Sequence, residues 1–370
     1  MTRIAFDATP AIVQQAGVGR YARELLAALL ELPGDDQYLV VSAGGERDNA
    51  QLLSALPPGA WRELRRLPLN PRMTTLAWQR ARLPLPIESL VGDFDVYHGT
   101  DFVVPPSRLP RVVTIHDLSF LIAPEFADPD LVRYLTNAVP RSLAAADVVV
   151  TVSASVAAEV ADAYPTVRDK LVAVPNGVRL PADPSPRSPQ IRPTILTVGT
   201  IEPRKNLSTL IRAMPIVRSD YPDAILQIAG RVGWRAADIV AEIRSAEAAG
   251  IVQFIETPDD ARLETLYAGA TLAVFPSWHE GFGLPVLESM ARGLPVVASD
   301  IPSLRETGAD AAEYAAPGDV DSIAGAIVRF LDSAPLRDEY AARGIARAQR
   351  YTWRETARRT RRAYQLATGG

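Results

Sequence analysis

The chain has 370 residues, 48% of them hydrophobic, a formal net charge of −4 and no cysteine. This length predicts two domains, and the hydrophobic content is sufficient for two ordinary cores. The acidic balance argues against a general nucleic-acid-binding protein, and the lack of cysteine excludes disulfides, thiol catalysis and zinc–thiolate sites.

The amino-terminal segment and the apolar stretches predict a cytoplasmic protein. The chain opens with MTRIAFDATP, which enters a predicted strand without the basic and apolar regions of a secretion signal. The most apolar stretch, Ala144–Ala158, carries Asp147, and no apolar run reaches the roughly 18 residues that a membrane span requires. We therefore expect neither secretion nor a membrane-spanning helix.

Short β-branched runs alternate with longer helical patterns from one end of the chain to the other, which predicts a doubly wound α/β fold. Helices are expected between the strands, the first of them at Tyr21–Leu32. In chain order, the predicted strands are Arg3–Ala8, Tyr38–Ser42, Phe94–Tyr97, Arg111–Ile115, Val148–Val152, Leu171–Val174, Ile195–Val198, Ile225–Ala229, Val252–Ile255, Leu272–Phe275 and Val296–Ala298.

A proline-rich segment divides the chain into two parts. Residues 181–193 hold five prolines, a composition that excludes helix and central strand and is typical of a linker. We therefore predict an amino-terminal Rossmann-like domain at 1–180 and a carboxyl-terminal Rossmann-like domain at 194–351.

The carboxyl-terminal segment 352–370 predicts an amphipathic helix. One stripe of this helix carries Trp353, Ala357, Thr360 and Tyr364, whereas arginines occupy most of the remaining surface. Because such a helix needs a surface to cover, we expect it to pack back on the first domain.

Chemically distinctive residues follow several predicted strands. They are Gly17 and Gly19, His98, His116, the segment Thr200–Asn206, and Glu280. Open α/β sheets bind their ligands at the carboxyl ends of the strands. The pattern therefore predicts one ligand-binding cleft between two Rossmann-like domains.

The segment SWHEGFGLPVLESMARGLPVVA holds two acids around a glycine-rich turn. Glu280 precedes Gly281, Phe282 and Gly283, and Glu288 is expected in the first turn of the helix that follows. Backbone N–H groups at a helix start, flanked by carboxylates, suit a polyhydroxylated anion such as a sugar nucleotide. The alternative is a capped helix with a solvated acid.

A second motif, Glu202-Pro203-Arg204-Lys205-Asn206, places two cations before a predicted helix. Asn206 is expected to cap this helix, so the cations lie beside its positive end, where a bound anion would stabilise them. Arg204 can bind phosphate in a bidentate manner, and Lys205 supplies a point charge. The only other lysine in the chain is Lys170. Ordinary solvated surface charge is the alternative.

The histidines and the first glycine pair carry weaker signals. His116, followed by Asp117, is interpreted as a ligand-facing residue, with a buried core imidazole as the alternative. His98 and His279 are assigned to the acceptor side or left open, since His279 could simply flank the loop at Glu280. The turn Gly17-Val18-Gly19 could present N–H groups to a phosphate or could be a plain tight turn.

Residues Trp61–Pro84 form a basic segment with six arginines and one glutamate. Trp61, Met73 and Trp78 lie among the arginines. This composition suits an anionic membrane surface or a lipid-linked acceptor, and an ordinary solvated helix and loop fits it equally.

Taken together, these motifs resemble the retaining GT-B glycosyltransferases of family GT4 over nearly the full length. The resemblance rests on the pair Glu280 and Glu288 around GFGLP, on GTIEPRKN, on HD after a strand of the first half, on PNGV before the linker and on GVGRYARELL. It implies an α/β protein of GT-B fold, with two Rossmann-like doubly wound domains facing a central cleft. The segments YHGTDF, TIHDLSF and VGTIEPRKNL are most similar to bacterial polysaccharide mannosyltransferases, which use GDP-mannose.

The resemblance implies a donor site in the second domain. Glu288 would hold the ribose hydroxyls, Glu280 would hold the donor hexose, and the N–H groups from Gly281 to Leu284 would contact the sugar and the diphosphate. Some members carry arginine where this chain has Thr200, so more of the phosphate contact would fall to Arg204. Residues Gly17, Gly19 and Thr200 complete the expected donor site.

The resemblance also implies a metal-independent reaction without a cofactor. Arg204 and Lys205 would neutralise the departing diphosphate, and His116 would contact the donor sugar near the reacting carbon. No DxD-like metal pair occurs in the cleft motifs. Retention is thought to proceed on one face of the sugar, with a leaving-group oxygen taking the acceptor proton and no protein nucleophile.

Two other functions share this architecture. A nucleotide-sugar 2-epimerase binds the same donors but lacks the paired acids and the EPRKN motif. A non-enzymatic sugar-binding protein would not need two cations at a helix start. We therefore predict a hexosyltransferase that acts at the cytoplasmic membrane face on a glycan or lipid-linked acceptor.

Overall fold

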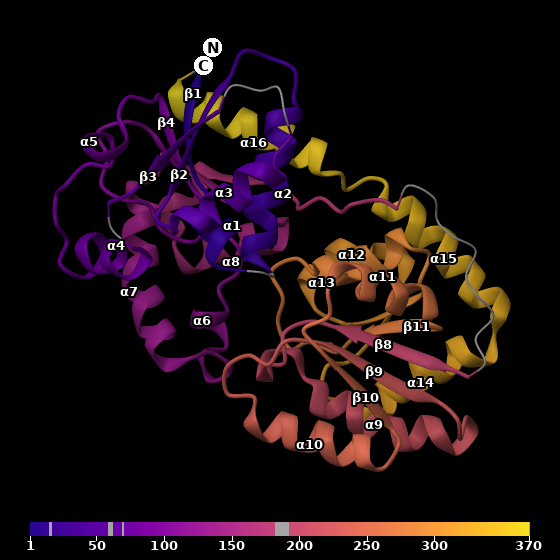
Figure 1. Ribbon diagram of the computed structural model, residues 1–370. Coiled ribbons are helices and arrows are strands. Elements are labelled where there is room, and N and C mark those ends of the chain that lie inside the picture. The colour runs from indigo at the N-terminus through magenta and orange to yellow at the C-terminus, as the bar shows by residue number, and fades with distance from the viewer. Residues whose placement is uncertain (15–16, 58–61, 69, 182–191, 370) are drawn as a thin grey trace. The chain divides into compact units, whose positions relative to one another are not determined.

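The computed structural model describes residues 1–370 apart from 15–16, 58–61, 69, 182–191 and 370. The chain forms two compact units, each of which is a parallel sheet with helices packed on it (Figure 1). Unit 1 consists of Met1–Leu118, Arg133–Gly177 and Trp353–Gly370, and unit 2 consists of Ser119–Val132 and Val178–Thr352. Most of the predicted linker lies outside the described residues.

The sheet of unit 1 has seven strands in the described part of the chain, in the order β3-β2-β1-β4-β5-β6-β7, and all of its pairs are parallel. The central strands are buried on both faces, as their continuous apolar runs require. The strands are β1 (Arg3–Asp7), β2 (Gln37–Ser42), β3 (Arg62–Arg66), β4 (Val96–Gly99), β5 (Arg111–Ile115), β6 (Val148–Thr151) and β7 (Leu171–Ala173).

The helices of unit 1 bury apolar stripes against this sheet. Helix α2 (Val18–Glu31) buries Tyr21, Leu25 and Leu29, which recur at helical spacing. The other helical elements are α1 (Thr9–Val13), α3 (Glu46–Ala55), α4 (Pro71–Thr74), the π-helix η1 (Thr75–Arg80), α5 (Glu88–Val91), α7 (Pro129–Ala145), which begins within the segment assigned to unit 2, α8 (Ala154–Ala163), the 3-10 helix η3 (Pro165–Lys170) and α16 (Trp353–Thr368).

Helix α16 packs on unit 1 although it follows the whole of unit 2 in the sequence. It contacts α2 and the strands β4, β5 and β6. Its buried side is the stripe expected from the sequence, and it includes Trp353, Ala357, Thr360 and Tyr364. The hydroxyl of Thr356 donates a hydrogen bond of 2.8 Å to the carbonyl of Pro175, which joins the start of the helix to the segment before the proline-rich region.

The sheet of unit 2 has six strands among the described residues, in the order β10-β9-β8-β11-β12-β13, again all parallel. The strands are β8 (Thr194–Val198), β9 (Ile225–Gly230), β10 (Val252–Glu256), β11 (Leu272–Phe275), β12 (Val296–Ser299) and β13 (Ala312–Ala315). Ile195, Leu226 and Val274 from adjacent strands meet in one apolar core with Leu210 and Met214 of the following helix.

The helices of unit 2 include a long pair, α9 and α14, that pack against each other. Asp319 caps α14 by accepting a hydrogen bond of 2.9 Å from the backbone N–H of Ser322. The helical elements are η4 (Pro203–Lys205), α9 (Leu207–Asp220), α10 (Ala237–Ala248), α11 (Asp260–Gly269), α12 (Leu284–Ala291), α13 (Pro302–Gly308), η5 (Ala309–Ala311), α14 (Val320–Asp332) and α15 (Ala334–Ala348).

A short excursion from the first half of the chain belongs to unit 2. The segment 119–132 includes α6 (Ser119–Ile122) and η2 (Pro124–Phe126). The indole of Trp234 donates a hydrogen bond of 2.9 Å to the carbonyl of Phe126, whose ring stacks on Trp278. The sequence-based division at 180 and 194 does not include this excursion, because no local pattern marks it.

Candidate active site

The strand order of unit 2 reverses between β8 and β11, and a pocket lies at the carboxyl ends of these two strands. Such a reversal leaves a crevice because the two chain segments leave the sheet on opposite sides. The pocket is lined by Thr197, Val198, Gly199, Thr200, Ile201, Lys205, Leu207, Ile228, Phe275, Pro276, Ser277, Glu280, Gly283, Pro285 and Val286.

The loop after β8 carries the two cations in a tight turn. Pro203 opens the 3-10 helix η4, and Asn206 closes it in the left-handed conformation, with φ of 55°. The side chain of Asn206 does not cap α9 as expected. It instead donates a hydrogen bond of 2.9 Å to the carbonyl of Pro276 and accepts one of 2.7 Å from Thr209, because the left-handed backbone turns it toward the neighbouring loop.

The loop after β11 leads into α12 through a glycine turn. Gly283 has φ of 93°, and a Cβ atom there would lie 2.5 Å from the side chain of Leu304. Only glycine fits both the conformation and the space. Helix α12 begins at Leu284, with Pro285 in its first turn, as the sequence predicted.

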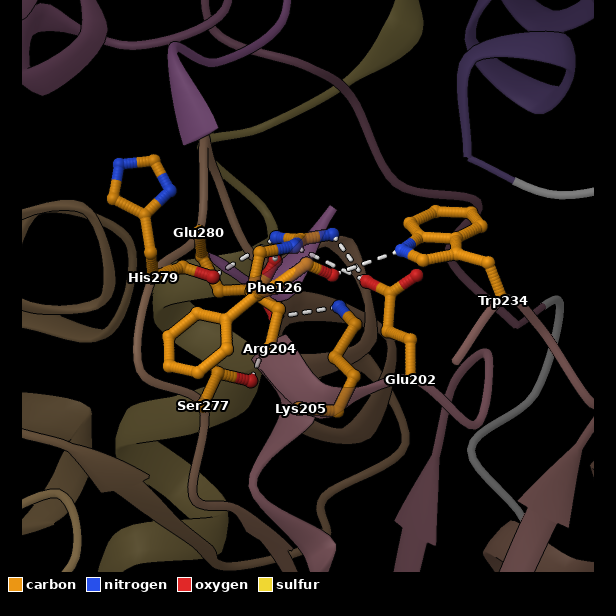
Figure 2. A network of polar contacts seen from close by, with 8 residues as sticks. All are labelled: Phe126, Glu202, Arg204, Lys205, Trp234, Ser277, His279 and Glu280. Carbon is orange, nitrogen blue, oxygen red and sulfur yellow. Dashed lines mark hydrogen bonds and ion pairs between the residues drawn. The ribbon is translucent and has the colours of Figure 1, made fainter. Parts of the chain in front are cut away.

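The two loops are joined by a cluster of four charged side chains, of which Glu202 is buried and the other three are partly buried (Figure 2). Lys205 Nζ lies 2.6 Å from one carboxylate oxygen of Glu280, and Arg204 Nη1 lies 3.1 Å from the other. The hydroxyl of Ser277 donates a further hydrogen bond of 2.8 Å to Glu280. Arg204 also pairs with Glu202, whose side chain is 1% exposed, at 2.8 Å.

The surroundings of Glu280 keep its carboxylate ionised. Burial alone would raise the pKa of this group, but the charges of Lys205 and Arg204, with hydrogen bonds from Lys205 and Ser277, lower its pKa to about 2. At neutral pH the carboxylate of Glu280 can therefore accept hydrogen bonds from sugar hydroxyls, and the neighbouring ammonium group of Lys205 can bind phosphate oxygens.

Glu288 is placed differently from what the sequence pattern predicted. It is the fifth residue of α12 and therefore lies beyond the first turn, and it is 8% exposed. The hydroxyl of Tyr267 donates a hydrogen bond of 3.2 Å to its carboxylate. Because it contacts Tyr267 of α11 (Asp260–Gly269), Glu288 is a buried acid and not the solvated one of the alternative interpretation.

Other predicted residues of this loop contribute through different atoms. The side chain of Phe282 is 4% exposed and packs edge-on against Tyr351, so a ligand contact at this residue would come from the backbone. The carbonyl of His279 accepts a hydrogen bond of 2.9 Å from Arg204, while its imidazole points away from the charged cluster (Figure 2). Gly281 is buried in the same turn.

The strand order of unit 1 reverses between β1 and β4, and several predicted residues lie near the carboxyl ends of its strands. Gly17 precedes α2 with φ of 57°, and a Cβ atom on Gly19 would lie 1.8 Å from the carbonyl oxygen of Gln14. His116 Nε2 lies 2.8 Å from the carbonyl oxygen of Thr100. Tyr21 packs edge-on against the same imidazole.

His98, which was assigned from the sequence to the acceptor side or left open, lies in the core of unit 1 and does not face an acceptor. It lies within β4, has no exposed surface, and its two ring nitrogens lie 2.8 Å from the hydroxyls of Tyr364 and Thr114. Burial, followed by the charge of His116, lowers its pKa to about 3. A neutral imidazole with two hydroxyl partners is a structural group.

Two buried carboxyl groups near this edge of the sheet, Asp7 and Asp101, were not among the residues singled out from the sequence. Asp7 ends β1 and accepts a hydrogen bond of 2.9 Å from the N–H of Thr9, and Asp101 follows β4 and accepts one of 2.8 Å from Gln14. Burial raises the pKa of both carboxyl groups. Asp117, which follows His116, is half-buried.

The basic segment Trp61–Pro84 is only partly described. Its first part forms the edge strand β3, in which Arg65 pairs with Glu63 and Arg66 is exposed. Among the described residues in and beside the segment, the large apolar side chains of Met73, Leu76, Leu83 and Leu85 are exposed. In the part of the chain that the structure describes, no helix has the length and apolar character needed to cross a bilayer.

Comparison with known proteins identifies the fold. A family model described as Glycosyltransferase Family 4 matches residues 16–180, and one described as Glycosyl transferases group 1 matches residues 181–347. The structure also resembles sucrose-phosphate synthase from Thermosynechococcus elongatus, with a TM-score of 0.73 and 20% identity over 99% of this chain and 98% of that one. The fold is therefore that of a GT-B glycosyltransferase.

The sequence relatives narrow the family. The O-antigen chain mannosyltransferase B of Escherichia coli is 33% identical over 287 residues, which cover 73% of this chain and 74% of the relative. A phosphatidyl-myo-inositol mannosyltransferase of Mycobacterium leprae is 33% identical over 211 residues, about half of either chain at 54%. The chain belongs to glycosyltransferase family GT4. This confirms the prediction of a glycosyltransferase and disfavours the two alternatives, a nucleotide-sugar 2-epimerase and a non-enzymatic sugar-binding protein.

Proposed function

We propose that this glycosyltransferase is a retaining enzyme that transfers mannose from GDP-mannose to a glycan or a lipid-linked glycan. The observation that carries the proposal is the ion pair of Lys205 with Glu280 in the wall of the unit 2 pocket. The ammonium group suits a diphosphate, and the carboxylate suits the hydroxyls of a hexose. The choice of mannose is supported by two relatives named as mannosyltransferases.

Transfer breaks the bond between the anomeric carbon and an oxygen of the diphosphate. A bond forms from the same carbon to an acceptor oxygen on the same face, and the acceptor proton passes to the departing diphosphate. Negative charge accumulates on the diphosphate as its bond breaks. In this proposal Lys205 and the N–H groups at the start of α12 (Leu284–Ala291) offset that charge.

The proposed reaction needs no divalent metal. In enzymes that use one, the metal neutralises the diphosphate, and here Lys205 would take that role with Arg204 beside it. Glu280 would hold the donor hexose and Glu288 the ribose, as the family resemblance implies. No protein nucleophile is required, because the acceptor attacks the anomeric carbon directly.

The test is a panel of nucleotide sugars that includes GDP-mannose, UDP-glucose and UDP-N-acetylglucosamine. Nucleoside diphosphate release is measured with and without oligosaccharide and lipid-linked acceptors, and binding is measured by thermal shift. We expect acceptor-stimulated release of GDP from GDP-mannose, which Lys205→Met abolishes. Preferred turnover of a UDP-sugar would contradict the donor assignment, and release from no donor would contradict the enzymatic function itself.

We further propose that the basic segment holds the enzyme at the anionic inner face of the cytoplasmic membrane. Exposed Arg66 and Arg72 occur in the same segment as exposed Met73 and Leu76, a composition that suits the interface between headgroups and acyl chains. Each arginine near such a surface contributes about 1 kcal/mol. This location would bring the donor site to a lipid-linked acceptor.

The membrane proposal is tested by co-sedimentation with vesicles of phosphatidylglycerol and phosphatidylcholine over a salt series. Binding should weaken with salt because the Debye length falls from about 10 Å at 0.1 M to about 3 Å at 1 M. Arg66→Ser with Arg72→Ser should reduce binding, whereas the exposed pair Arg47→Ser with Arg168→Ser is the matched control. No binding at low salt would favour a soluble acceptor.

A further inference from the structure

Glu202 belongs to the EPRKN motif, but it does not line the pocket, and the family resemblance assigns it no role. It follows β8 in extended conformation, and Pro203 then opens the tight turn that leads to the cations. Its side chain is 1% exposed, and one carboxylate oxygen accepts hydrogen bonds from Arg204 Nε at 3.1 Å and Nη2 at 2.8 Å. A buried carboxylate is costly unless it is paired, so this pairing requires a reason.

The other end of the Arg204 guanidinium reaches the loop after β11. Nη1 donates to the carbonyl of His279 at 2.9 Å and to Glu280 at 3.1 Å. A guanidinium is planar and rigid, so holding one edge on Glu202 sets the direction of the other edge. The backbone N–H of Trp278 also donates to the carbonyl of Arg204 at 2.9 Å, which adds a bond between backbone atoms of the two loops.

The pocket separates these residues into two kinds. Lys205 and Glu280 line it, whereas Glu202 and Arg204 are not among its lining residues. Glu280 is held on one oxygen by Lys205 and Ser277 and on the other by Arg204. The direction in which its carboxylate meets a ligand therefore depends on Arg204 and, through Arg204, on Glu202.

We propose that Glu202 and Arg204 are positioning residues, and that Glu202 acts on the reaction by orienting Arg204, which orients Glu280. This inference rests on the proposed function and refines it. Lys205 is the cation that meets the diphosphate, and Arg204 is the rigid link that keeps Glu280 aimed into the pocket. The cluster contains two carboxylates, Glu202 and Glu280, and two cations, Arg204 and Lys205. Because Arg204 pairs with both carboxylates, Lys205 can move toward a diphosphate while Arg204 continues to hold Glu280.

The decisive experiment is a double-variant cycle in the full chain. Glu202→Gln keeps the shape of the side chain and removes its charge, and Arg204→Met removes the link. We expect Glu202→Gln to lower kcat at least tenfold while the KM for the donor changes less than threefold. Because Glu202 acts only through Arg204, adding Glu202→Gln to Arg204→Met should lower kcat by less than a further twofold.

Controls separate positioning from general destabilisation. Glu313→Gln breaks another carboxylate–arginine pair of unit 2, with Arg329, outside the pocket and should leave kcat within twofold of wild type. Glu202→Asp keeps the charge and should recover part of the lost kcat; it also serves if Glu202→Gln does not fold. Multiplicative losses in the cycle, or a wild-type kcat in Glu202→Gln, would overturn the proposal.

A readout without substrate distinguishes this proposal from the proposed function. If Glu202 and Glu280 share Arg204, the loss of Tm in the double variant Glu202→Gln with Glu280→Gln is smaller than the sum of the two single losses. Additive losses would refute the link even in an active enzyme. A wild-type protein that releases no nucleoside diphosphate would refute the proposed function, and the Tm cycle would still decide whether the link exists.

Discussion

Replacing Glu280 by Gln should destabilise unit 2 and remove part of its acid sensitivity. The substitution preserves shape but leaves Lys205 and Arg204, which are 17% and 15% exposed, without one of their counter-ions. The pKa of Glu280 is lowered from 4.5 to about 2. That difference corresponds to a stabilisation of about 3 kcal/mol at neutral pH.

The sign of the pH dependence follows from the lowered pKa. As pH falls, the unfolded chain takes up the proton before the folded chain does, so the stabilisation is complete above about pH 4.5 and is lost as pH falls toward about 2. The wild type should therefore exceed Glu280→Gln by about 3 kcal/mol at pH 7. The difference between the two proteins should narrow steadily below pH 4.5.

The measurement is urea unfolding between pH 7 and pH 2.5, followed by fluorescence, with Trp234 and Trp278 reporting on unit 2. The control is Glu313→Gln, whose partner Arg329 has a side chain 61% exposed, so its loss should be below about 1 kcal/mol. A loss below about 1 kcal/mol in Glu280→Gln, or a difference that does not narrow in acid, would refute the stabilising role of the cluster.

Three further predictions follow from the two units. Glu288→Gln should weaken donor binding by about 1.5–3 kcal/mol, measured by calorimetry. Tyr267→Phe removes only the hydroxyl that donates to Glu288 and should weaken binding less. Unchanged donor affinity in Glu288→Gln would show that Glu288 does not belong to the donor site. Excess chelator should leave turnover intact while Lys205→Ala lowers kcat by about 100-fold or more, and strict dependence on Mg²⁺ or Mn²⁺ would contradict the proposed mechanism. The pKa of His98 is lowered from 6.5 to about 3, so the free energy of unfolding of unit 1 should fall by about 1.4 kcal/mol per pH unit between pH 6.5 and pH 3. In urea unfolding, His98→Asn should show a smaller decrease per pH unit than the wild type. The same decrease in both proteins would mean that other groups cause the acid sensitivity.

The strands with β-branched runs were predictable because a parallel strand that is buried on both faces requires a continuous apolar segment. Two edge strands were missed, β3 (Arg62–Arg66) and β13 (Ala312–Ala315). The sequence of β3 is RELRR, which has no apolar run, and it becomes a strand only because the edge of β2 offers it a partner. Pairing of this kind is a tertiary property and leaves no local signal.

The candidate donor site divides in the same way. Glu280, Gly283 and Lys205, which line the pocket of unit 2, were singled out as candidates from the sequence because a glycine turn, a helix start and a rare lysine are local features at strand ends. The pairing of Arg204 with Glu280 joins residues 76 positions apart and was not predictable from either motif. The same holds for the hydrogen bond between Tyr267 and Glu288.

By itself, the sequence determined the α/β class, the strand ends that carry the site and the family, since each depends on short-range periodicity or on the wording of a motif. The tertiary structure alone decided which polar groups meet. It buried His98 between Tyr364 and Thr114, which lie 266 and 16 residues away, and made a structural group of a residue that looked available to a ligand. Whether a side chain is buried and which group it pairs with depend on which distant elements pack together. The stability of such a buried polar pair therefore comes from the tertiary structure and cannot be read from a local motif.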